Sequence, residues 1–245
     1  MQSNPKQTIF DSSTTLMLIP AHNEQTTVGE IVHAVKQTTC CQVAVIDDAS
    51  TDNTVTAASA AGALVLPLAL QLGAWGAIQT GIRYALSRGY RTVVSIDADG
   101  QHDAAYIDTL LNPIIAREAD VVIGACPLRV SCARRIAWSY FRLLSGVRLE
   151  DITSGFRAYN YTAMQALAAP EASLLDYQDV GVLLILRRKG LRIREVSVEM
   201  SPRTTGISRV FSSWLIVARY MLQTSLLCIA RIGMNGTEHH PPRMK

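Results

Sequence analysis

The chain has 245 residues, of which 49% are hydrophobic and 18% charged, so it can bury a sizeable core and general disorder is excluded. Five cysteines, an odd number without zinc-ligand spacing, exclude a disulfide scaffold and predict reduced thiols. Residues Met1–Thr15 are polar and lack the apolar segment of a secretory signal, so we expect a cytoplasmic protein.

The net charge of +3 is unevenly distributed along the chain. Residues 183–245 contain 11 lysines and arginines against 3 acidic residues, whereas residues 1–182 contain 12 against 17. A basic C-terminal quarter suits phosphate ligands, an anionic membrane surface or nucleic acid, and a solvated basic face is the alternative. We expect no nucleic-acid partner, because the chain has no recognisable motif or aromatic platform for one.

Short apolar segments alternate with helical patterns through the first half of the chain. This alternation predicts an α/β fold, with a mostly parallel, Rossmann-like sheet and helices on both faces. The predicted strands are Leu16–Ile19, Val43–Ile46, Ala63–Leu66, Thr92–Ile96 and Asp120–Ile123. The predicted helices are Thr26–Gln37, Asn53–Ala60, Ala77–Ser87, Ala104–Arg117 and, in the second half, Val180–Lys189.

Polar clusters follow three of the predicted strands, at Pro20–Glu24, Asp47–Asp52 and Asp97–Asp103. Ligands of open α/β sheets bind beyond the carboxyl ends of the strands, so we expect the three clusters to converge on one rim. Carboxylates that repel one another at one edge are costly unless a cation or a donor-rich ligand lies among them. The sequence therefore predicts a ligand site at this rim.

The segment Asp97-Ala98-Asp99 comes directly after a predicted core strand. Alternate side chains of an extended turn point the same way, so Asp97, Asp99 and Gln101 would present oxygens to one ion. Such ligands, with positions left for waters and substrate phosphates, are typical of Mg²⁺ or Mn²⁺. His102 is a further candidate, although a lone histidine is more often a hydrogen-bonding group. An acidic surface turn is the alternative interpretation.

Seven segments of the chain, spread over about residues 16–221, together resemble one protein family. They are Ile19–Glu24, Val45–Thr54, Gly73–Gly81, Ser95–Asp103, Thr153–Tyr159, Glu195–Met200 and Arg203–Ser208. The family is the family 2 glycosyltransferases of GT-A fold, and the subgroup they resemble most is the dolichol- and polyprenyl-phosphate sugar transferases. The resemblance implies inverting transfer of a sugar from a nucleotide-diphosphate sugar to polyprenyl phosphate or a lipid-linked saccharide, in cell-envelope polysaccharide or glycan synthesis.

The resemblance also implies roles for individual residues. The nucleotide-sugar-binding residues would be Pro20, Ala21, Glu24, Asp48, Asp97, Ala98 and Arg129, and the metal ligands would be Asp97, Asp99 and Gln101. The catalytic residues would be Asp99, Arg157, Arg203 and Asp179. The arginines would offset the charge on the leaving diphosphate, and Asp179 would deprotonate or orient the acceptor. Ordinary ion pairs for the arginines and helix capping for Asp179 are the alternatives.

Departures from the family pattern leave other interpretations open. Ala49 replaces a usual glycine, Trp75 interrupts a run of small residues, and Gly181 stands where relatives often carry a second acid. The segment Ala125–Arg129 replaces the expected Gly-Ser-Arg. A non-catalytic GT-A-fold scaffold or binding subunit of a glycan-assembly complex is therefore the alternative. Nucleotidyl transfer is disfavoured, because Pro20–Glu24 is not a glycine-rich loop bearing arginine or lysine.

The segment Ile207–Ile232 has the pattern of a helix with a wide apolar face, basic flanks and Trp214. Its apolar runs are far shorter than the ~20 residues that span a bilayer. We therefore expect an amphipathic helix at the cytoplasmic face of the membrane, bound to lipid or to a small membrane-protein partner, with packing on the catalytic domain as the alternative. The predicted divisions are a catalytic domain (1–206), this segment (207–234) and a disordered tail (235–245).

Overall fold

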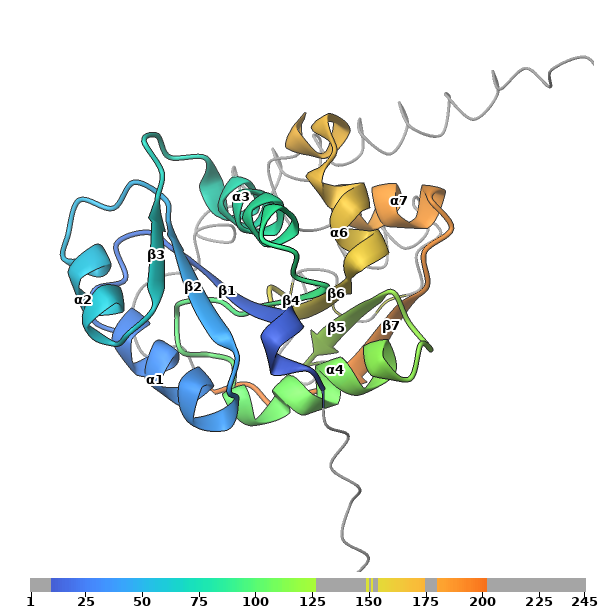
Figure 1. Cartoon of the computed structure of the whole chain (residues 1–245), viewed down its shortest axis with the longest axis horizontal. Helices are drawn as coiled ribbons and strands as arrows, with labels where there is room; N and C mark the ends of the chain where they lie inside the picture. Colours follow the sequence, from blue (N-terminus) through green and yellow to red (C-terminus); the bar gives the residue numbers. More distant parts are fainter. Residues whose placement is uncertain (1–9, 127–148, 150, 152–153, 175–179, 202–245) are drawn as a thin grey trace, which may run out of the picture.

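The structure is a computed structural model that describes residues 10–126, 149, 151, 154–174 and 180–201. Its centre is a seven-stranded sheet with the order β3-β2-β1-β4-β6-β5-β7 (Figure 1). The strands are β1 (Thr15–Ala21), β2 (Gln42–Asp47), β3 (Leu64–Pro67), β4 (Thr92–Ser95), β5 (Val121–Ala125), β6 (Arg157–Asn160) and β7 (Ile193–Ser197). Only β6 runs antiparallel to its neighbours among these strands, so the predicted mostly parallel α/β sheet is confirmed.

Helices cover both faces of the sheet (Figure 1). One face carries α3 (Gly73–Ser87), α6 (Tyr161–Ala168) and α7 (Val180–Arg188); the other carries α1 (Val28–Thr38), α2 (Thr54–Ala60) and α4 (Ile107–Ile115). Side chains alternate along a strand, so β1 supplies both cores: Leu16 and Leu18 pack on the α3 side, and Met17 and Ile19 on the α1 side.

The observed boundaries differ from the predicted ones mainly at two helices. Helix α3 begins at Gly73 rather than Ala77, and the predicted helix Ala104–Arg117 is a 3₁₀ turn, η2 (Ala104–Tyr106), followed by α4. Asp103 caps that turn by accepting a hydrogen bond from the Ala105 N–H. The sequence predictions omitted β6, α6 and β7.

Helix α3 approaches the sheet closely because Gly81 faces it. A Cβ atom added at Gly81 would lie 2.8 Å from Leu18 Cδ1 and 3.0 Å from Ile46 Cδ1. A larger residue would push the helix away from β1 and β2. The glycine therefore fixes how α3, whose first turn lies beside the polar rim, sits on the sheet.

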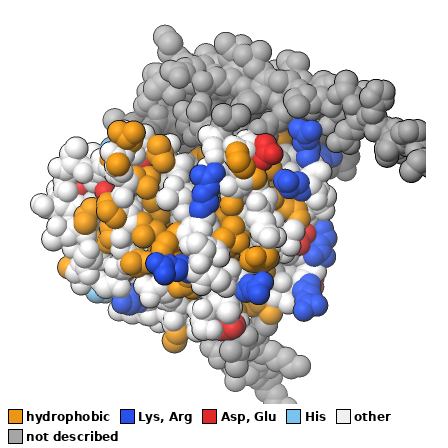
Figure 2. Space-filling model, turned by 45° about the horizontal axis from the view of Figure 1, so that its top comes forward, with side chains coloured by type: hydrophobic (Ala, Val, Ile, Leu, Met, Phe, Trp, Pro, Cys, Tyr) orange, Lys and Arg blue, Asp and Glu red, His pale blue; other side chains and the backbone are white. Residues whose placement is uncertain are grey.

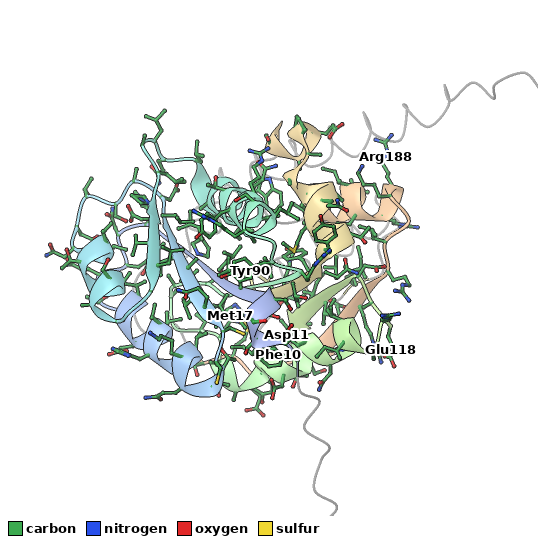
Figure 3. All side chains as sticks on the ribbon, in the orientation of Figure 1. Phe10, Asp11, Met17, Tyr90, Glu118 and Arg188 are labelled. Atoms are coloured by element: carbon green, nitrogen blue, oxygen red, sulfur yellow. The ribbon has the colours of Figure 1, made fainter. Side chains whose placement is uncertain are left out.

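The described part of the C-terminal quarter carries basic residues on α7, on β7 and between them, and Figure 2 shows lysine and arginine side chains spread over one side of the molecule. Two of them are paired: Arg192 contacts Asp120 at 3.1 Å, and Arg194 forms an ion pair with Glu118. Figure 3 shows Glu118 and Arg188 projecting from this same side. Part of the basic excess is therefore matched within the chain.

No helix within the described ranges has the length and hydropathy needed to cross a membrane. The predicted amphipathic segment (207–234) and the tail (235–245) lie outside the described residues. The boundary at residue 206 lies outside them as well.

Candidate functional site

The three predicted polar clusters lie together at the carboxyl ends of adjacent parallel strands. Strand β1 pairs with β2 on one side, where Ala21 lies opposite Asp47, and with β4 on the other, where Leu18 lies opposite Ser95. The Asp48 N–H donates to the Ala21 carbonyl oxygen at 2.8 Å. The predicted convergence on one rim is confirmed.

Hydrogen bonds from side chains join the loops that follow β1 and β2. Asn23 accepts from the Thr51 N–H at 2.8 Å, and its own N–H donates to Ser50 Oγ at 2.9 Å. The Glu24 N–H donates to Thr54 Oγ1 at 2.8 Å. Asn23 has φ 56°, a conformation that asparagine adopts more readily than most residues. The two loops are therefore one connected unit that holds Glu24 at the rim.

Thr27 connects this unit to the loop after β4. Its hydroxyl lies 2.7 Å from the Ala98 carbonyl oxygen and 3.2 Å from the Glu24 carboxylate. A hydroxyl has one hydrogen, so the shorter contact marks the main acceptor. Thr27 is a site residue that the sequence did not predict, because its partner is 71 residues away and no local pattern marks the contact.

Asp48 has a structural role in addition to the expected one. The side chain is buried, and its two oxygens accept from the backbone N–H groups of Leu72 at 2.6 Å and Gly73 at 2.9 Å. These groups begin α3, where N–H groups lack helical partners and negative charge is favoured. This anchor explains why α3 starts at Gly73, four residues before its predicted start at Ala77. Each carboxylate oxygen has a further lone pair for a ligand.

The turn after β4 presents the predicted metal ligands. Asp99 is almost buried and accepts from the Gln101 N–H at 3.1 Å, whereas the Asp97 side chain is 36% exposed. Gly100, with φ 73°, supplies the left-handed conformation that the turn needs. The Gln101 carbonyl oxygen accepts from the Ser201 N–H at 2.9 Å, which ties the turn to the chain beyond β7.

The donor set fits a divalent cation that also binds substrate phosphates. No group of three or more histidine, cysteine, aspartate or glutamate residues able to hold a metal occurs among the described residues. Mg²⁺ commonly takes only one or two carboxylates from the protein and completes its shell with phosphates and waters. Two aspartates and the oxygen of Gln101 match that requirement.

Arg157, the predicted phosphate-binding arginine, begins β6 between β4 and β5. Its side chain is fully buried, and its Nε–H donates to the Ser154 carbonyl oxygen at 2.8 Å. The arginine is therefore part of the sheet interior, and its contact with phosphate stays a prediction. Arg129, Asp179 and Arg203 lie outside the described residues.

Comparison with known proteins places the chain among sugar-transferring enzymes. The model of glycosyl transferase family 2 matches residues 17–170. An undecaprenyl-phosphate mannosyltransferase of Micrococcus luteus is 34% identical, over 80% of this chain and 86% of that protein. A polyprenol monophosphomannose synthase of Mycolicibacterium smegmatis is 29% identical, over 94% and 90%.

A likeness to solved structures supports the same fold. Glucosyl-3-phosphoglycerate synthase of Mycobacterium tuberculosis, solved with Mn²⁺, UDP-glucose and phosphoglyceric acid, superposes with a TM-score of 0.69. The match covers 90% of this chain and 80% of that chain at 20% identity. At this identity the likeness establishes the fold alone.

Proposed function

Because this chain belongs to family 2 of the glycosyltransferases, we propose that it moves a sugar, with inversion, from a nucleotide-diphosphate sugar to polyprenyl phosphate. The observation that carries the proposal is the rim where Glu24, Asp48, Asp97 and Asp99 follow three neighbouring parallel strands. The choice of polyprenyl phosphate as the acceptor is supported by two relatives that are named for polyprenyl phosphates and match this chain over most of their length. The product would serve cell-envelope polysaccharide or glycan synthesis.

On the donor side, Pro20, Ala21, Glu24, Asp48 and Ala98 line the nucleotide pocket, with the carboxylates accepting from base and ribose groups. Asp97, Asp99 and Gln101 hold Mg²⁺ or Mn²⁺, which when bound offsets the charge that develops on the diphosphate. The connections through Thr27 and Asp48 support this assignment, because they fix the three loops before a ligand arrives.

On the acceptor side, Asp179 orients the polyprenyl phosphate, which is already anionic and needs little deprotonation. Arg129, Arg157 and Arg203 supply positive charge for the phosphates. The segment 207–234 docks the enzyme on the cytoplasmic face of the membrane, directly or through a small membrane protein. The basic composition of residues 183–245 supports this placement, because anionic lipid headgroups attract it.

The test is a titration of UDP, GDP and dTDP into the full-length protein, with and without Mn²⁺, followed by calorimetry. We expect one nucleotide to bind with Mn²⁺ and Asp99→Asn to abolish that dependence, because the variant keeps the side-chain shape but loses the charge. The matching nucleotide sugars are then supplied with polyprenyl phosphate in vesicles, and we expect one of them to yield a lipid-linked sugar. Absence of binding by every nucleotide would favour the scaffold interpretation.

A further inference from the structure

The Asp97 carboxylate lies against Gly155, from the segment before β6, and against His102, from its own loop after β4. We propose that Gly155 and His102 form a seat for this carboxylate and act as positioning residues for the metal and nucleotide that Asp97 binds. This inference rests on the proposed function. It gives Gly155 a role in the site, and it gives His102, a candidate metal ligand from the sequence, a supporting role instead.

Gly155 forms the base of the seat. A Cβ atom added there would lie 2.2 Å from Oδ1 and 2.3 Å from Oδ2 of Asp97, far inside van der Waals contact. The carboxylate therefore occupies the space in which any other residue's side chain would begin. Ser95, fully buried in β4, donates from Oγ to the Gly155 carbonyl oxygen at 2.7 Å, so the glycine backbone cannot withdraw easily.

His102 forms the side of the seat. Its side chain is 1% exposed, and Nε2 lies 3.4 Å from Asp97 Oδ2. That separation is at the upper limit for a hydrogen bond, so packing is the main restraint on the ring. The ring lies against Phe156, with centroids 5.1 Å apart, and the His102 backbone pairs with Met200. Nδ1 has no hydrogen-bond partner among the described residues, which leaves Nε2 as the atom that engages Asp97.

The seat leaves the carboxylate few orientations. One side is closed by backbone and another by a buried ring, while 36% of the side chain remains exposed. A ligand group held in one orientation loses less entropy when it binds its partner. Gly155 also lies two residues before Arg157, where β6 begins, so the seat links the donor turn to β6.

The first test is Gly155→Ala, measured by calorimetric titration of the nucleoside diphosphate that the wild-type protein binds, and by electron paramagnetic resonance of Mn²⁺ binding. Residues that support metal ligands typically change metal affinity by roughly 10–100-fold when replaced, and we expect a loss of that size. Nucleotide binding without metal should change much less. The matched control is Gly29→Ala, whose Cβ would lie 3.7 Å from the Ala57 carbonyl oxygen, an ordinary contact.

The second test uses His102 and does not depend on whether Gly155→Ala folds. His102→Leu removes Nε2 and should weaken Mn²⁺-dependent binding, whereas His102→Gln places an amide nitrogen near the same position and should restore it. Equal affinities of these two variants, or wild-type affinity in a folded Gly155→Ala protein, would overturn the seat and leave the proposed function standing. A wild-type protein that binds no nucleotide would instead overturn the proposed function, and the seat with it.

Discussion

The two halves of the sheet are built in different ways. From β1 to β4, each strand is followed by a helix, and the strands pair in parallel. From β5 to β7, the strands are not all parallel, because β6 lies antiparallel between β4 and β5. The first half carries the donor rim, whereas the second half closes the sheet through long-range pairing. Successive strand–helix units thus form the proposed donor site, and contacts between residues far apart in the sequence hold it in place.

One face of α3 joins the two halves. Trp75 donates from Nε1 to the Ala172 carbonyl oxygen at 2.7 Å, and Gln79, one turn later, donates from Nε2 to the Leu167 carbonyl oxygen at 2.9 Å. Another turn along, Arg83 Nε donates to the Ala168 carbonyl oxygen at 3.0 Å. Trp75 departs from the family pattern of small residues, and the structure gives it a role: it is buried and binds the end of the segment that leads toward Asp179.

The largest effect on stability is expected in the first half, at Gly81. Gly81→Val would place methyl groups against Leu18 and Ile46, which already approach an added Cβ to 3.0 Å or less. Overpacking of this kind costs about 1–3 kcal/mol, and the helix propensity of valine offsets little of it. Urea unfolding would measure the loss.

Gly29→Ala, at a half-buried position of α1 near α2, is the matched control for Gly81→Val. An added Cβ meets only an ordinary contact there, and alanine is the better helix former, so we expect unchanged or slightly raised stability. Equal midpoints for both variants would show that the close contact of α3 with the sheet adds nothing to the stability of the first half.

The same contrast explains what the sequence could and could not predict. The rim can be predicted from the alternation of strands and helices in the sequence. A parallel sheet brings the carboxyl ends of β1, β2 and β4 together whatever the details of packing. The roles of Thr27 and Gly155 depend on partners far away in sequence, so no local pattern reveals them. Strand β6 has only four residues and begins with a buried arginine, which a search for apolar strands passes over.

A smaller effect is expected in the second half, at Asp120. Its carboxylate accepts from Asn160 Nδ2 at 2.8 Å and from the Arg192 N–H at 2.8 Å, and so ties the end of β6 and the start of β7 to the start of β5. Asp120→Ala removes both acceptors and should cost about 1–2 kcal/mol, because the exposed Arg192 N–H can bond to water instead. Urea unfolding would measure the loss. If β5, β6 and β7 unfold together with the first half, every spectroscopic probe of unfolding will report the same lowered urea midpoint.

The pH dependence of stability separates the charge of Asp120 from its hydrogen bonds. Hydrogen bonding and the adjacent Arg192 guanidinium lower the pKa of Asp120 in the folded protein. As the pH falls, the Asp120 carboxylate therefore binds a proton in the unfolded chain before it does so in the folded protein. Its contribution to the free energy of unfolding is complete above about pH 4 and is lost below it. We expect the wild-type protein to lose more stability than Asp120→Asn between about pH 5 and about pH 3, because the unfolded pKa of aspartate is about 3.9. Identical pH profiles would contradict this assignment.

The smallest effect on stability is expected from relieving backbone strain, at one position in each half of the sheet. Ala49, in the loop after β2, has φ 56°, and Arg117, in the loop before β5, has φ 57°. A left-handed conformation costs a residue with a Cβ roughly 1–2 kcal/mol, and glycine removes that cost while gaining freedom in the unfolded chain. We therefore expect Ala49→Gly and Arg117→Gly each to raise the free energy of unfolding by about 0.5–1 kcal/mol, measured as a higher urea midpoint with an unchanged slope. A gain at Arg117 together with a loss at Ala49 would mean that contacts of the Ala49 methyl group, beside the proposed nucleotide pocket, outweigh its strain.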